Sequence, residues 1–126
     1  MSSSEDQHPA EWSLRAELSG LRVSSVVFVE DYLQLILDGG LKGITVHAPP
    51  AIVSERDTIE FNDERFARLA RELLGTEIVD ASADGTRAVV VFSNGLQLVV
   101  PFSPGMVEPM LVRRLDGVVV LPDDAL

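Results

Sequence analysis

The chain has no cysteine among its 126 residues and only two histidines, His8 and His47. The missing thiols exclude disulfides, thiolate catalysis and cysteine-based metal sites. With so few histidines, little can exchange protons near neutral pH. Glycine-rich phosphate loops, HExxH, EF-hand spacings and GxSxG elbows do not occur either. We therefore expect no cofactor and no metal, and we favour a protein that is not an enzyme.

Long hydrophobic runs are also missing. The apolar runs reach about five residues, against the roughly 20 that a membrane-spanning helix needs. The first residues are polar and acidic, without the basic start and apolar centre of a secretory signal. These features predict a cytoplasmic protein that does not enter a membrane.

Basic residues are scarce. Lysine and arginine together number 10, against 20 aspartates and glutamates, for a formal charge of −10. Proteins that bind nucleic acid or anionic lipid do so through clustered basic side chains, so the charge argues against both partners. It is compatible with solubility alone, or with a basic protein partner.

What the chain does have is a β-hairpin pattern that occurs twice. Two β-rich runs flank Asn94-Gly95, a dipeptide suited to a two-residue type I′ turn. A shift of 55 residues places Leu33–Pro49 on Ala88–Pro104 without a gap and Val23 on Ile78. The sequence therefore predicts the same hairpin in two places.

The first hairpin is predicted to have one apolar and one mixed face. If Gly39-Gly40 forms a two-residue turn, alternation places Leu33, Leu35, Leu37, Ile44 and Val46 together. The opposite face carries Tyr32, Gln34, Thr45 and His47, with Ile36. A cross-strand Tyr–His pair can transfer protons or simply stabilise a sheet. These four polar residues are the candidate ligand-binding set.

The second hairpin is apolar on both faces. A two-residue turn places Val89, Val91, Leu98 and Val100 on one face, and Ala88, Val90, Phe92 and Val99 on the other. A single helix cannot cover both faces, so one face needs a terminal segment or a second subunit. We predict a homodimer with Val89, Val91, Leu98 and Val100 at or near the interface.

One amphipathic helix is predicted over Asn62–Leu74, with Asn62 as N-cap and Gly75 after its end. Its apolar stripe consists of Phe66, Leu69, Ala70, Leu73 and Leu74. The alternating pattern of Glu11–Leu18 favours a strand, although its residue types favour a helix. Met110–Leu115 and Val118–Leu121 predict a further hairpin around Asp116-Gly117.

Together these elements predict an α+β domain, a mostly antiparallel sheet built from two β-hairpin repeats with one amphipathic helix between them. A small open β-barrel with one helix is the alternative. The expected domain covers residues 11–122, between a disordered tail at 1–10 and a C-terminal tail at 123–126.

Three segments resemble a family of small bacterial domains of unknown function. They are RVSSVVFVEDYLQLILDG from Arg22 to Gly39, a helix ending in Leu73-Leu74-Gly75-Thr76, and VVVFSNGLQLVV from Val89 to Val100. Two features depart from that family: FNDERFARLARELLG replaces a glycine-rich segment, and Ser93-Asn94-Gly95 replaces Asp-Gly. The resemblance implies a fold and a bacterial origin but no reaction.

The surface and the charge of the chain are therefore the features that indicate its function. The interpretation we favour is a non-catalytic domain that acts through protein–protein interaction. A small-molecule-binding domain or weak enzyme using the face of Tyr32 and His47 is one alternative. An acidic toxin-neutralising protein is another, by analogy of size and charge alone.

Overall fold

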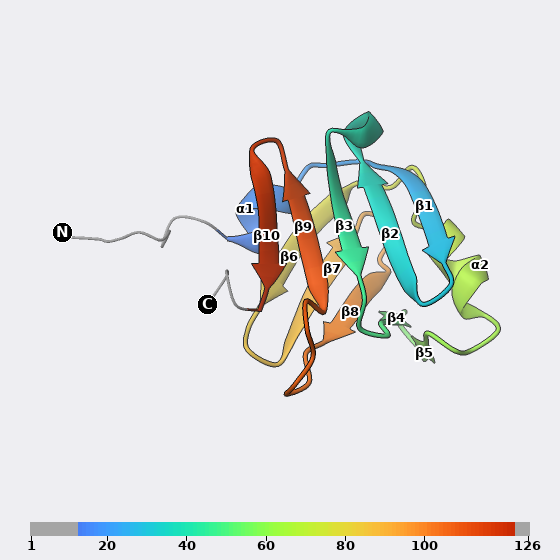
Figure 1. Ribbon diagram of the computed structural model, residues 1–126. Coiled ribbons are helices and arrows are strands. Elements are labelled where there is room, and N and C mark those ends of the chain that lie inside the picture. The colour runs from blue at the N-terminus through green and yellow to red at the C-terminus, as the bar shows by residue number, and fades with distance from the viewer. Residues whose placement is uncertain (1–12, 123–126) are drawn as a thin grey trace.

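The computed structural model describes residues 13–122, so the two predicted tails, with Glu11 and Trp12, lie outside the described residues. Within them, strands form two five-stranded antiparallel sheets (Figure 1). The first sheet has the order β1 (Val23–Val29), β2 (Tyr32–Leu37), β3 (Lys42–Val46), β9 (Met110–Arg114), β10 (Gly117–Leu121). The second has the order β5 (Thr58–Glu60), β4 (Ala51–Val53), β8 (Gln97–Pro101), β7 (Arg87–Phe92), β6 (Ile78–Ala83). The helices are α1 (Leu14–Leu18), the short 3-10 helix η2 (Asp38–Gly40) and α2 (Phe66–Arg71).

The α+β class with mostly antiparallel strands is confirmed, but the layers differ from the expectation. The two sheets lie one behind the other in Figure 1 and share one hydrophobic core. They do not close into a barrel, because each retains two edge strands. The second sheet covers the inner face of the first, so the amphipathic helix expected between the two repeats does not form a layer of its own. Instead α2 lies to one side, where Phe66 packs edge-on against Phe28 of β1 and against Phe61, with ring centroids 6.4 and 5.1 Å apart.

Each half of the chain completes the sheet of the other half. The meander β1–β2–β3 is extended by β9, where Val46 pairs with Met110. The meander β6–β7–β8 is extended by β4, where Val99 pairs with Ala51. The hairpin β4–β5 therefore follows the first meander in the sequence but belongs to the second sheet, and β9–β10 does the reverse.

The 55-residue repeat is confirmed in the first two strands of each meander. Val23 pairs with Leu37 and Ile78 with Phe92, and both strand pairs shift register at the next residue. The relationship continues before the strands. The Gly20 amide donates to the Ile78 carbonyl at 2.7 Å, and the Gly75 amide donates to the Val23 carbonyl at 2.8 Å. Equivalent groups thus bond each other reciprocally, which gives the two halves an approximate two-fold axis near the bridge between Arg22 and Glu77.

The third strand of each meander departs from the repeat. The first hairpin has a four-residue connection, Asp38 to Leu41, between the paired residues Leu37 and Lys42. In the second, Ser93-Asn94-Gly95 connect Phe92 to Leu96, whose carbonyl accepts from the Phe92 amide at 2.9 Å. The prediction that the two hairpins are the same is therefore wrong in the turn, and the registers differ by one residue.

Two helical segments differ from the prediction. Leu14–Leu18 is a helix and not a strand, because the Ser13 hydroxyl caps it by accepting from the Ala16 amide. Leu14 and Leu18 lie one turn apart and are buried, so the alternating pattern was misleading. The predicted helix of Asn62–Leu74 begins later, at Phe66, and is shorter; its N-cap position is Arg65.

Candidate functional site

The polar face predicted on the first hairpin forms as expected. Tyr32 on β2 and His47 just after β3 lie across from each other, with ring centroids 5.1 Å apart and planes inclined at 72°. Next to them Gln34 pairs with Thr45, and the Gln34 amide nitrogen lies 3.5 Å from the Thr45 hydroxyl. Their partners Leu33, Leu35, Ile44 and Val46 are fully buried on the other face. The structure therefore brings all four candidate residues together.

His47 has one ring nitrogen engaged. Its Nδ1 lies 2.9 Å from the backbone carbonyl of Glu108. A carbonyl oxygen can only accept, so Nδ1 carries the proton in this contact. The backbone amides of His47 and Ala48 both donate to the Pro109 carbonyl, at 2.9 and 3.1 Å. This strand end is thus tied to the loop before β9, and the ring is part of that attachment.

A catalytic constellation needs more than this pair. A base is normally oriented by a third group and aimed at a nucleophile or an acid. The partner of His47 is a backbone carbonyl, which has no proton to exchange. Among residues 13–122, no group of three or more histidine, aspartate or glutamate side chains could hold a metal ion. The ring pair is therefore best explained as an edge-to-face contact between neighbouring strands, which stabilises the sheet.

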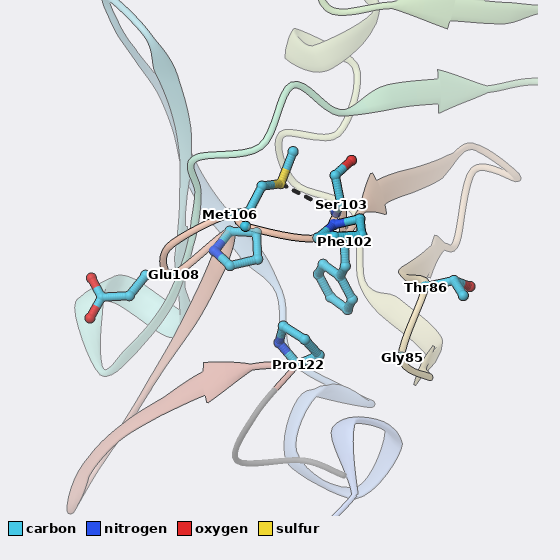
Figure 2. A pocket seen from close by; sticks show the side chains of 10 residues that line it. Gly85, Thr86, Phe102, Ser103, Met106, Glu108 and Pro122 are labelled. Atoms are coloured by element: carbon cyan, nitrogen blue, oxygen red, sulfur yellow. Dashed lines mark hydrogen bonds between the residues drawn. The ribbon is translucent and has the colours of Figure 1, made fainter.

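Two hollows on the described surface lie elsewhere. One, of about 350 Å³, lies among loops that include Gly85-Thr86 and Phe102–Met106, with Pro122 at its margin (Figure 2). Its Thr86 hydroxyl is already bonded to Asp84, at 2.7 Å. The other, of about 450 Å³, lies between the turns Ser54–Asp57 and Asn94–Leu96. Neither hollow is lined by the candidate ligand-binding residues Tyr32, Gln34, Thr45 and His47.

The predicted interface residues do not share a face. Leu98 and Val100 are fully buried in the core of the chain, on the inner side of β8. Val89 and Val91 point the opposite way and are half-buried. The reason is the turn: three connecting residues instead of two reverse the alternation of β8 relative to β7. The assignment of Leu98 and Val100 to the outward face is therefore wrong.

The actual outward residues form what we call the valine face, which consists of Val53, Val89, Val91 and Val99. Val89 pairs with Val99 and Val91 with Gln97, which pairs in turn with Val53. All four valines are half-buried. Sequence reasoning assigned Val53 to no strand and placed Val99 on the other side. A Val-rich segment between Pro50 and Ser54 is the signal that could have identified β4.

The two halves differ in what they present outward. The 55-residue offset relates Tyr32 to Arg87 and Gln34 to Val89. On the facing strands, Thr45 pairs with Gln34, whereas Val99 pairs with Val89. One half thus has a polar column where the other half is aliphatic. The outer faces of the two halves therefore differ in chemistry.

Within residues 13–122, three carboxylates have lowered pKa values, and all belong to local structure. Hydrogen bonds from the Arg65 side chain and amide lower the pKa of Asp63 to about 2. The Arg15 guanidinium, 2.6 Å away, lowers the pKa of Asp80, helped by the Ala81 amide. Hydrogen bonds from Thr86 lower the pKa of Asp84. These groups stabilise turns and a helix contact, so none of them identifies a reactive centre.

Comparison with known proteins gives no assignment. No family model, no curated protein and no solved structure matches this chain. The resemblance to small bacterial domains of unknown function therefore stays a prediction. Within residues 13–122, no helix has the length and the apolar character that crossing a membrane requires.

Proposed function

We propose that this chain is a non-catalytic protein-interaction domain that forms a homodimer through the valine face. The observation that carries the proposal is the outward side of β4, β8 and β7, where four half-buried valines lie on three neighbouring strands. Such strands lie about 4.8 Å apart, so Val89 and Val99 are direct neighbours, and Gln97 lies between Val91 and Val53. Apolar patches of this kind on a sheet surface favour association with another protein.

A second copy of the same chain suits this patch. In a two-fold dimer the same surface of each subunit forms the interface, so residues near the axis contact their own copies and must not repel them. The centre here contains valines and Gln97 and no charged group. The margins are charged, with Glu60 on β5 at one side and Asp80 on β6, which pairs with Val91 and is bonded to Arg15, at the other. A two-fold axis along the strands would place the Glu60 margin of one copy near the Arg15–Asp80 pair of the other.

The test is Val91→Asp, measured by light scattering at several protein concentrations. We expect the wild type to have the mass of a dimer and the variant that of a folded monomer, because an aspartate at a dry interface would be buried without a partner. Circular dichroism establishes that the variant is folded. A wild type that remains a monomer at high micromolar concentration would rule the homodimer out.

The chain offers a matched control in Ile36→Asp. Ile36 corresponds to Val91 in the repeat and is also half-buried and outward, but it lies on the first sheet. We expect Ile36→Asp to remain a dimer. Equal loss of the dimer in both variants would mean that the effect is general destabilisation and not an interface on the valine face.

A further inference from the structure

The outward side of the first sheet is a second surface, which we call the tyrosine face. It consists of Val27, Tyr32, Gln34, Ile36, Thr45 and Leu111. The pairing Val27–Gln34–Thr45–Leu111 runs in one row across four strands, and all four side chains are half-buried. The chain has 20 acidic residues, yet none of these six is charged. An uncharged centre on so acidic a protein is a local exception that calls for an explanation.

One basic group reaches this side of the sheet, and it is engaged. Arg113 on β9 donates from its guanidinium to the Gly40 carbonyl at 3.1 Å and to the Lys42 carbonyl at 3.4 Å. It lies over Gly43, where an added Cβ would approach its Nη2 to 3.2 Å. This arginine therefore closes the end of the face near η2.

The opposite end of the tyrosine face is acidic. Glu30 and Asp31 form the turn between β1 and β2, directly before Tyr32, and both are exposed. Glu108 is exposed too, and its backbone carbonyl is bonded to His47, the ring neighbour of Tyr32. No ion pair within residues 13–122 involves these three carboxylates. Their charges are therefore available to a partner.

We infer that the tyrosine face docks a different protein, one whose contact surface combines apolar and uncharged polar side chains and carries lysines or arginines along one side. The apolar side chains match Val27, Ile36 and Leu111 around the Gln34–Thr45 pair, and the basic side matches the acidic end at Glu30, Asp31 and Glu108. Aromatic residues such as Tyr32 supply large contact area at interface centres. The flanking carboxylates select the charge of the partner and accelerate its approach. This surface is separate from the valine face and does not depend on the homodimer.

A random-peptide library displayed on phage is a probe that assumes no partner in advance. It is selected on the wild-type chain and counter-selected on Ile36→Asp, and the enriched peptides are then measured by calorimetry. We expect enriched peptides that combine apolar residues with Lys or Arg. Ile36→Asp should weaken their binding by about tenfold or more, as for a central interface position, while Val91→Asp should leave it unchanged.

A charge test completes the experiment. Glu30→Gln with Asp31→Asn should weaken binding of the same peptides and flatten its dependence on salt. The inference is overturned if no peptide is enriched over the counter-selection, if enriched peptides lack basic residues, or if they bind Ile36→Asp as well as the wild type. It is also overturned if Ile36→Asp is a folded monomer while Val91→Asp remains a dimer, because a second copy would then occupy this face.

Discussion

Ile36 and Val91 occupy equivalent positions in the two halves of the molecule. Ile36 pairs with Ser25 and Val91 with Asp80, in each case the residue at which the register of the first strand shifts. Both side chains point outward and are half-buried. The molecule therefore contains its own comparison: a change at one position can be judged against the same change at the other.

Val90 and Val91 lie on opposite faces of the second sheet. Val90 is fully buried and Val91 is half-buried on the opposite side of the same strand. Val90→Asp should abolish folding, because an unpaired buried carboxylate costs several kcal/mol. Val91→Asp should leave a folded chain. Circular dichroism and one-dimensional NMR distinguish the two, and a folded Val90→Asp would contradict the sheet packing.

The buried leucines of the two helical segments should contribute alike. Leu18 and Leu73 are equivalent in the repeat, and neither is exposed. Leu18→Ala and Leu73→Ala should each lower the free energy of unfolding by about 2–5 kcal/mol, the usual range for a buried leucine. Leu69 is only partly buried, so Leu69→Ala should cost less. Urea unfolding measures all three; an unchanged midpoint for Leu73→Ala would mean that the segment does not close the core.

The second turn is tied to the end of α2 by one side chain. The Asn94 amide nitrogen donates to the Glu72 carbonyl at 3.0 Å, and its oxygen accepts from the Leu96 amide at 3.1 Å. Asn94→Ala should cost about 1–2 kcal/mol, because two hydrogen bonds are lost. Gly95→Ala should also destabilise, since Gly95 has a φ of 89° that alanine adopts with strain. Thermal unfolding checks both, and a stable Asn94→Ala would show that water replaces the side chain at no cost.

Acid should weaken the fold through Asp63. Its pKa is lowered from 3.8 to about 2 in the folded chain by the bonds from Arg65. The stabilisation is therefore fully present above pH 3.8 and is lost as the pH falls towards 2. Asp63→Asn should reduce the decline of the urea midpoint over that range. Because the pKa values of Asp80 and Asp84 are lowered too, part of the decline should remain. A decline identical to that of the wild type would contradict the role of Asp63.

The first hairpin could be predicted from the sequence, and the second could not, for one reason. Alternation depends on whether the connection has an even or an odd number of residues. The first connection has four residues where two were expected, so the pairing of Leu35 with Ile44 kept its face. The second has three, which moved Leu98 and Val100 to the core side. The Asn-Gly signal predicts a turn but leaves its length open.

Other differences come from contacts between distant residues. The pairing of β4 with β8 joins segments that nothing in the local sequence relates, and so does that of β3 with β9. The pair Tyr32–His47 was predictable, because both residues belong to one hairpin. The contact of His47 with Glu108 was not, because it depends on where β9 enters the sheet. Sequence patterns thus predicted the residues that the first hairpin contributes to the tyrosine face, but not Val27, Leu111 or the acidic end.

The exchange of hairpins between the halves has a consequence for how the chain folds. Each meander can form from neighbouring residues, which is fast, but its sheet stays incomplete until the other half supplies two more strands. Loss of one half would expose the inner face of the other and also remove its β4–β5 or β9–β10 hairpin. Neither half can therefore melt alone, and we expect one cooperative transition in which the long-range strand pairs form last and break first.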